Sequence, residues 1–153
     1  MKEYEYSFEV KSLQPYIIYC QNNKYTMKDR NEQVRVIYRN TNKTMARITI
    51  NKNLNKTVKT LDFKDDLLTN DVLIERRESK ELNFFDDDAV YSILEFLNYK
   101  KDNTLIRTRT VYEKDGVKFE LDDYQKPKKT FVVAVEGEKE KVDKIYEDIK
   151  NLI

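Results

Sequence analysis

Hydrophobic and polar residues alternate with period 2 along several segments of the chain, beginning with residues 3–10, EYEYSFEV. Side chains of a β-strand point alternately to opposite faces, so this pattern predicts a strand with an aromatic and apolar row on one face. The other face carries Glu3, Glu5 and Glu9. Carboxylates about 7 Å apart repel one another unless cations, basic side chains or water lie between them. This face therefore either meets solvent or binds something.

The same alternation recurs along the rest of the chain and predicts further strands. They span residues 32–39, 44–52, 53–64, 72–82, 103–112, 117–124 and 131–137. Residues 11–23 contain an apolar patch that fits either a short helix or a buried connection. The polar residues 24–31 predict a loop, and residues 40–43 and Asp115-Gly116 predict turns.

Helical spacing of apolar residues occurs in two places. Any of Asp86, Asp87 and Asp88 could cap a helix, and these acids fit a role in the cap and helix dipole better than a catalytic one. The two apolar stripes are Val90, Ile93, Leu94 and Leu97, and Val142, Ile145, Ile149 and Leu152. Together with the strands, they predict an α+β fold in which helices flank an antiparallel, barrel-like sheet, forming a single domain over residues 1–153.

Composition narrows the class of protein. Although 37% of the 153 residues are charged and the mean hydropathy is −0.82, the chain contains 11 Tyr and 7 Phe and should fold. Its 29 basic and 28 acidic side chains give a net charge of +1, so there is no strong nucleic-acid signal. The single Cys20 forms no internal disulfide, and no apolar run resembles a signal peptide or a membrane span. We expect a cytoplasmic protein that makes no membrane contact.

Missing residue types exclude several chemistries. With no histidine, the chain lacks Ser-His-Asp and Cys-His catalysis and imidazole metal ligands. With two glycines, it lacks the glycine-rich loops that bind phosphates through backbone amides. Any metal must therefore be held by oxygen, which favours hard cations, and any phosphate must be bound by side chains.

The polar rows of the predicted strands are rich in arginine. A solvated outer face would explain a polar row, and periodicity alone does not exclude it. Arginine, however, has a planar fork that suits bidentate recognition of phosphate. The arginines concerned are Arg35, Arg39, Arg47, Arg76, Arg107 and Arg109. If the sheet curls with this row inside, they line an anion site, and Glu3, Glu5 and Glu136 become ligands for a hard metal at its wall.

The order of these motifs resembles the CYTH superfamily of triphosphate tunnel enzymes, which includes thiamine triphosphatases, inorganic triphosphatases and class IV adenylyl cyclases. The resemblance is carried by EYE at 3–5, RVIYR at 35–39, ARITINK at 46–52, RRE at 76–78, IRTRTVYEKDGVKFELDDY at 106–124 and FVVAVEGE at 131–138. It implies an eight-stranded antiparallel tunnel in which acidic residues hold Mg²⁺ or Mn²⁺ and basic residues bind a small-molecule triphosphate.

Matched position by position, the resemblance implies roles for named residues. Catalytic roles fall to Glu3, Glu5, Arg107 and Arg109, and metal binding to Glu3, Glu5 and Glu136. Phosphate binding falls to Arg35, Arg39, Arg47, Arg76, Arg107, Arg109 and Lys118, with Glu78, Glu120 and Asp122 as further acidic residues of the tunnel. Three positions depart from the motif: Ser7 and Asn51 replace expected lysines, and Ala134 replaces an expected glutamate.

Three functions are compatible with this resemblance. The leading hypothesis is a divalent-metal-dependent phosphohydrolase acting on inorganic triphosphate, thiamine triphosphate or a nucleoside triphosphate. The first alternative is a non-catalytic tunnel domain that binds a nucleotide or polyphosphate. The second is a class IV-like adenylyl cyclase. The sequence leaves the substrate, the metal preference and the oligomeric state open.

Overall fold

The strands form one curled antiparallel sheet in the computed structural model of the chain, which describes residues 2–66 and 73–152, without the side chains of Lys2 and residues 73–76. The strands are β1 (Lys2–Val10), β2 (Thr26–Arg39), β3 (Thr44–Asn53), β4 (Lys56–Asp65), β5 (Leu73–Arg77), β6 (Leu82–Asn83), β7 (Lys100–Lys114), β8 (Val117–Lys126) and β9 (Thr130–Gly137). The helices are α1 (Gln14–Asn22), α2 (Asp87–Phe96) and α3 (Lys139–Ile149). The order in the sheet is β5-β1-β9-β8-β7-β2-β3-β4-β6.

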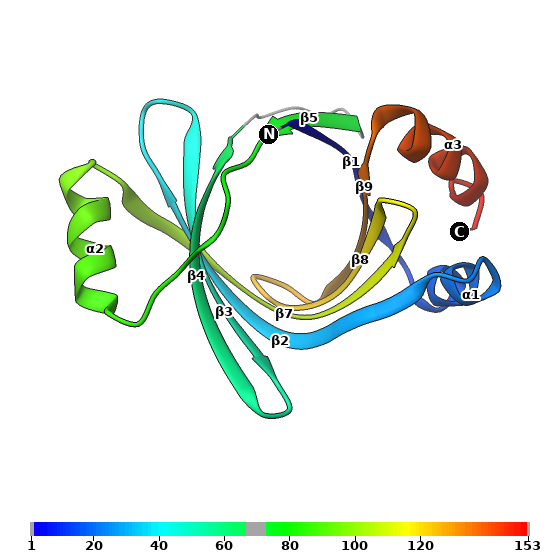
Figure 1. The fold of residues 1–153 in the computed structure, drawn as a ribbon, viewed down its shortest axis with the longest axis horizontal. Helices are drawn as coiled ribbons and strands as arrows, with labels where there is room; N and C mark the ends of the chain where they lie inside the picture. The colour runs from blue at the N-terminus through cyan, green and yellow to red at the C-terminus, as the bar shows by residue number, and fades with distance from the viewer. Residues whose placement is uncertain (1, 67–72, 153) are drawn as a thin grey trace.

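The two ends of the sheet approach each other and enclose a tunnel. Lys64 of β4 makes an isolated bridge with Glu78, which follows β5. Next to it, the backbone N–H of Ser79 donates a hydrogen bond to the carbonyl oxygen of Phe63 at 2.9 Å. Figure 1 shows the strands surrounding a central space. The sheet is curled and does not close through a continuous ladder, and its eight longer strands confirm the predicted α+β tunnel fold.

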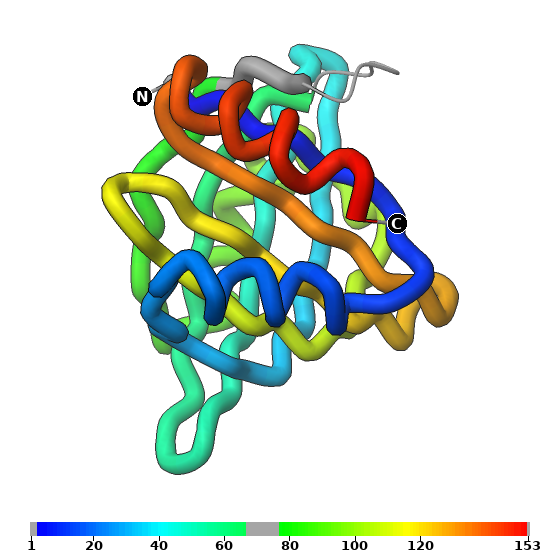
Figure 2. The backbone as a smooth tube through the Cα atoms, turned by 90° about the vertical axis from the view of Figure 1, so that its right-hand side faces the viewer, coloured from blue at the N-terminus to red at the C-terminus, as the bar shows by residue number. Residues whose placement is uncertain are grey.

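The apolar rows of the strands face outward and form the main hydrophobic core under two helices. Helices α1 and α3 lie against the outer face of β8 and β9 (Figure 2). The fully buried side chains there include Tyr16, Cys20, Phe119, Leu121, Val133, Val135, Val142 and Ile149. Burying these residues outside the barrel leaves the alternate, polar row of every strand to face the tunnel.

Helix α2 covers a second, smaller core on the outer face of β3 and β4. The side chain of Asp86 caps it by accepting a hydrogen bond from the Ala89 backbone N–H at 3.0 Å. Only part of the predicted stripe is buried, because Val90 and Leu94 pack on the sheet whereas Ile93 remains 54% exposed. None of the three helices described has the length and apolar character needed to cross a membrane.

The prediction of a loop at 24–31 is wrong, because β2 begins at Thr26. Asp29 pairs with Val111 and Asn31 with Arg109 in the β2–β7 ladder. Asp29 and Asn31 line the polar tunnel, and the residue between them is exposed and also polar. This part of β2 therefore lacks the apolar row from which a strand would be predicted. The ambiguous residues 11–23 contain α1, and the predicted turn at Asp115-Gly116 forms with positive φ at both residues, 50° and 78°.

Candidate functional site

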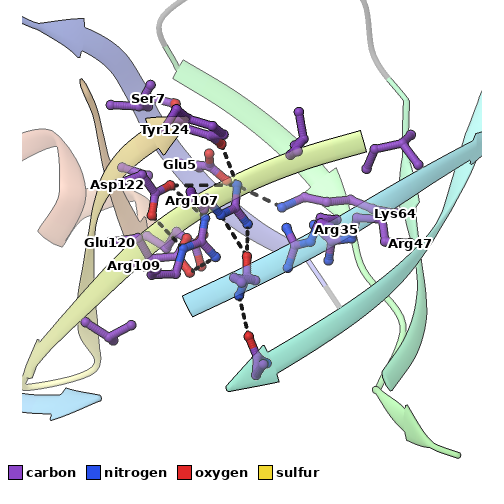
Figure 3. A pocket seen from close by; sticks show the side chains of 18 of the residues that line it. Glu5, Ser7, Arg35, Arg47, Lys64, Arg107, Arg109, Glu120, Asp122 and Tyr124 are labelled. Carbon is purple, nitrogen blue, oxygen red and sulfur yellow. Dashed lines mark hydrogen bonds and ion pairs between the residues drawn. The ribbon is translucent and has the colours of Figure 1, made fainter. Parts of the chain in front are cut away.

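The polar rows of the strands enclose a tunnel cavity of about 390 Å³. Most of the predicted site residues line it: Glu5, Arg35, Arg39, Arg47, Glu78, Arg107, Arg109, Lys118, Glu120, Asp122 and Glu136. Figure 3 shows several of them converging from strands on different sides of the tunnel. The described lining residues carry seven basic and seven acidic side chains, so the cavity is formally neutral despite its charge density.

Three carboxylates meet at one wall of the tunnel. Oxygens of Glu3, Glu5 and Glu136 all lie within 4.8 Å of one another, and Glu5 pairs directly with Glu136 in the β1–β9 ladder. Burial and the neighbouring carboxylate of Glu120 raise the pKa of Glu136 to about 10. Burial likewise raises the pKa of Glu3, whose Oε1 is buried and has no hydrogen-bond partner among the described residues. This set of oxygen donors fits Mg²⁺ or Mn²⁺.

Among the described side chains, Lys64 is the cation closest to Glu3 and Glu5. Its Nζ lies 3.0 Å from Glu3 Oε1 and 3.4 Å from Glu5 Oε2, and 3.9 Å from Glu78 Oε2. The side chain extends from β4 toward Glu5 (Figure 3) and is only 5% exposed. The acidic wall is therefore partly neutralised by an ammonium group from the opposite end of the sheet.

Arg109 is fully committed to carboxylates. Its Nε and Nη2 donate to the two oxygens of Asp122 at 2.8 and 2.9 Å, and its Nη1 donates to Glu120 at 2.7 Å. Burial lowers the pKa of Arg109, but Glu120 and Asp122 raise it by more, to well above the ordinary value. Bidentate pairing of this kind holds the guanidinium in one orientation.

Arg47 is committed in a similar way on β3. It donates to both oxygens of Asp62, one at 3.0 Å, and to Glu78 at 2.6 Å. Arg39 lies toward the edge of the tunnel, 36% exposed at its side chain, where it pairs with Asp66 at 2.7 Å and with Asp102. These two arginines therefore brace the wall through ion pairs.

Arg35 and Arg107 contrast with those arginines. The Nε of Arg35 donates to Thr49 Oγ1 at 3.0 Å, and no carboxylate of the described residues lies within ion-pair distance of its guanidinium. Burial and the charges of Arg47, Arg107 and Arg109 lower the pKa of Arg35 well below its ordinary value. Arg107 donates to Gln33 Oε1, at 2.7 Å from Nε, and to the Tyr124 hydroxyl. Its nearest carboxylate oxygen, on Asp122, is 3.8 Å away.

Two predicted phosphate-binding residues remain. Lys118 lies beside the acidic wall, with its Nζ 3.8 Å from Glu136 Oε2 and its side chain 41% exposed. Arg76 lies on β5 with its backbone opposite Glu3, and its side chain is outside the described residues. The structure thus brings all the predicted residues whose side chains it describes to one tunnel, with different partners.

Comparisons with solved structures agree with this architecture, although no protein-family model and no curated protein sequence matches the chain. A conserved hypothetical protein from Pyrococcus furiosus is 25% identical, with a TM-score of 0.77 over 98% of this chain and 90% of that one. A Vibrio parahaemolyticus protein proposed to be an adenylate cyclase is 12% identical, with a TM-score of 0.66 over 99% and 84%. A Hippeastrum protein described as having a dominant triphosphatase activity is 13% identical, with a TM-score of 0.66 over 98% and 87%. The chain shares its fold with these proteins, as its resemblance to the CYTH superfamily predicted.

Within this fold, two of the three departures from the motif are neighbours. Ser7 of β1 and Ala134 of β9 are direct partners in the β1–β9 ladder, and both line the tunnel. The chain therefore lacks an expected lysine and an expected glutamate at adjacent positions. Because one positive and one negative charge are lost together, the net charge of the tunnel is unchanged. The third departure, Asn51, accepts a hydrogen bond from Gln33 Nε2 at 2.7 Å.

The sequence analysis missed several residues that contact the predicted ones, and four of them matter most for the site. They are Gln33, Asp62, Lys64 and Tyr124. Gln33 and Tyr124 share strand parity with Arg35 and Asp122, which was a usable signal. Lys64 follows Asp62 by two residues and therefore lies on the same face of β4. The alternation does not show, however, that the curled sheet brings β4 next to β5, the strand that pairs with β1.

Proposed function

We propose that this chain binds a small-molecule triphosphate together with Mg²⁺ or Mn²⁺ in its tunnel and hydrolyses a phosphoanhydride bond of that ligand. The observation that carries the proposal is Arg35, a cation that faces the cavity without a carboxylate partner among the described residues. A guanidinium in this position has free donors directed at the space where an anion would lie. Glu5 and Glu136 of the acidic wall line the same cavity, and an oxygen of Glu3 lies within 4.8 Å of theirs.

The charge balance of the tunnel supports a metal-bound ligand. Seven basic and seven acidic side chains line the cavity, so a bare triphosphate would add several uncompensated negative charges. A divalent cation shared between carboxylates and phosphate oxygens removes this penalty, as is usual for Mg²⁺ in phosphate sites. Ligand binding should therefore depend strongly on the cation.

The residues divide the chemistry among them. Arg35 and Arg107 would bind phosphate oxygens and stabilise the charge that develops as the bond breaks. Glu3, Glu5 and Glu136 would hold the cation, which neutralises phosphate charge and polarises the scissile bond. In hydrolysis, a water oxygen bonds to phosphorus and the bridging oxygen leaves with the electron pair of the broken P–O bond. Arg109 acts as a positioning residue through Asp122 and Glu120.

A binding tunnel without turnover is a second candidate, favoured by one observation. Ser7 and Ala134 leave an uncharged place in the tunnel wall between the carboxylates of Glu5 and Glu120. Loss of a charged pair there removes groups that could position a reacting phosphate, while Arg35 and Arg107 still bind one. A cyclase would use the same arginines but would join the ribose 3′ oxygen to the α-phosphate, so its product distinguishes it.

The proposal is tested by thermal melting of the purified protein with tripolyphosphate or ATP, each with Mg²⁺, with Mn²⁺ or with chelator. A ligand that binds the folded state raises the melting temperature by mass action. We expect a cation-dependent rise, followed by phosphate release from the ligand that gives it. The rise should disappear in Arg35→Met and persist in Arg30→Met, a matched variant on the exposed face of the same strand.

The outcomes separate the candidate functions. Phosphate release supports the hydrolase, cyclic nucleotide supports the cyclase, and a rise without either product supports the binding tunnel. An equal rise for Arg35→Met and wild type would contradict the assignment of Arg35 to the ligand. Absence of any rise with every triphosphate would overturn the proposal.

A further inference from the structure

Lys64 occupies the space beside two of the three carboxylates proposed to hold the metal. Its Nζ is 3.0 Å from Glu3 Oε1 and 3.4 Å from Glu5 Oε2. A Mg²⁺ or Mn²⁺ ion bonded to the same oxygens would lie about 2.1 Å from them. An ammonium group and a divalent cation on the same oxygens repel each other at close range and in a poorly hydrated site. The two cations therefore compete for the acidic wall.

The contact of Lys64 with Glu3 is an ion pair rather than a well-oriented hydrogen bond. Glu3 Oε1 is buried and has no hydrogen-bond partner among the described residues, although Lys64 Nζ is close to it. The hydrogen bond that Lys64 does make, to Glu5, is long at 3.4 Å. A lysine side chain carries its charge on four methylene groups, so Nζ moves by several ångströms without a change in the backbone. The ammonium group can therefore leave Glu3 and Glu5 while the backbone of β4 stays in place.

A displaced ammonium group has one further carboxylate nearby, and that carboxylate is already partly engaged. Glu78, the third carboxylate near Lys64, already accepts a hydrogen bond from Arg47 at 2.6 Å. The side chain of Lys64 is 5% exposed and extends into the tunnel (Figure 3). The anion of a bound triphosphate would present further acceptor oxygens to this ammonium group within the same cavity.

We infer that Lys64 is an exchangeable cation, which neutralises Glu3 and Glu5 when metal is absent and moves to the phosphate of the ligand when metal binds. The inference rests on the proposed function, because it assumes a metal and a triphosphate in the same tunnel. Lys64 would then couple the binding of the metal ion to the binding of the triphosphate. Its removal should strengthen metal binding alone and weaken binding of the metal–triphosphate complex.

The test measures Mn²⁺ binding to the ligand-free protein by electron paramagnetic resonance and Mg²⁺-tripolyphosphate binding by calorimetry. In Lys64→Met we expect Mn²⁺ affinity to rise about tenfold or more, the scale on which neighbours of metal ligands change affinity. Affinity for Mg²⁺-tripolyphosphate should fall about tenfold or more, as for a lost charge-assisted hydrogen bond. Lys64→Arg keeps the charge and should not gain Mn²⁺ affinity.

Lys59→Met is the matched control. Lys59 lies on the same strand, β4, but pairs with Asp87 of α2 at 3.1 Å on the outer face. It should change neither affinity. If Lys64→Met lowers both affinities or leaves Mn²⁺ affinity unchanged, Lys64 is a structural ion-pair partner and the inference is wrong.

A measurement on the wild-type protein covers the case in which Lys64→Met does not fold. The ¹³Cε–¹Hε resonance of Lys64, assigned by its loss in Lys64→Arg, should shift when Mg²⁺ saturates the site. A resonance that stays in place at saturating Mg²⁺ would overturn the inference. If Mn²⁺ competes with Lys64 but no triphosphate binds to wild type, the cation exchange stands and the proposed function fails. If triphosphate binds but the cations do not compete, the function stands and the exchange fails.

Discussion

Arg109 and Arg35 lie on neighbouring strands of the same tunnel but have opposite surroundings. We call Arg109, Asp122 and Glu120 the paired region. We call Arg35 and Arg107 the unpaired region, because among the described residues Arg35 has no carboxylate partner and Arg107 has only a long ion pair of 3.8 Å with Asp122. In the paired region, every donor-bearing end of the guanidinium meets a carboxylate within 2.9 Å. In the unpaired region, the close partners are the neutral groups of Thr49, Gln33 and Tyr124.

This difference separates two uses of arginine in a polar interior. A buried ion pair is costly to break because one charge is left without a partner, so the paired region holds the barrel together. A cation without a counter-ion among the described residues, such as Arg35, stays poorly compensated until an anion arrives, which is why we propose that the unpaired region binds the ligand. The arginines of both regions line the same cavity, and they differ in the groups that surround them.

The largest effect on stability is expected in the paired region. Arg109→Met should destabilise the protein by about 3–5 kcal/mol, because Asp122 and Glu120 would remain buried without their cation. Urea unfolding of the ligand-free protein measures this loss. The control is Arg77→Met, which breaks a pair with Asp65 whose arginine is 71% exposed and should cost at most about 1 kcal/mol. Equal losses in the free energy of unfolding for the two variants would show that the paired region contributes no more to stability than an exposed ion pair.

The unpaired region should respond in the opposite way. Arg35→Met should lower affinity for Mg²⁺-tripolyphosphate about 10- to 100-fold, the loss expected for a charge-assisted hydrogen bond. The same change should leave the free energy of unfolding of the ligand-free protein unchanged or raise it by up to about 1 kcal/mol, because a poorly compensated charge is removed. Calorimetry and urea unfolding measure the two quantities. A large loss of stability in Arg35→Met would place Arg35 with the paired region.

Two carboxylates of the tunnel, Glu120 and Glu136, differ in the same way, because among the described residues one has an arginine partner and the other does not. Burial raises the pKa of Glu120 but Arg109 lowers it by more, so that Glu120 titrates well below its usual range, whereas the pKa of Glu136 rises to about 10. An unfolded glutamate loses its proton near about pH 4.3, so the folded protein binds an extra proton on Glu136 between that value and pH 10. Stability should therefore fall as pH rises through this window.

The measurement is the melting temperature of the metal-free protein in chelator. Between about pH 6 and about pH 9, wild type should lose at least about 2–4 °C, which corresponds to about 1 kcal/mol in a chain of this length. Glu136→Gln keeps a neutral side chain at every pH and should remove most of that slope. A variant with the slope of wild type would assign the pH dependence to another group.

Much of the fold follows from alternation in the sequence. Period 2 predicted the strands of the tunnel wall and the inward row of Arg107, Arg109, Glu120 and Asp122, because the pleat of a strand fixes which side chains share a face. Helical spacing predicted α2 and α3. The sequence analysis did not predict the start of β2. Its inward residues are polar and most of its outward residues are exposed and polar, so no alternation marks the strand there.

The candidate site was less predictable than the fold. Strand parity places a side chain inside the tunnel, but it does not give the register between strands distant in sequence. Lys64 reaches Glu3 and Glu5 only because the curled sheet brings β4 beside β5 and β1. The resemblance assigns one role to all seven predicted phosphate-binding residues. The structure gives Arg47 and Arg109 carboxylate partners, whereas Arg35 has none among the described residues.

The sequence by itself determined the elements, the polar interior of the sheet and the residue types available for chemistry, since these depend on local periodicity and composition. Only the tertiary structure decided which charges neutralise one another. Ion pairing depends on distances of a few ångströms between strands, and those distances are set by the curl and register of the whole sheet. For this protein, those distances separate Arg47 and Arg109, which pair with carboxylates, from Arg35, which has no carboxylate partner among the described residues.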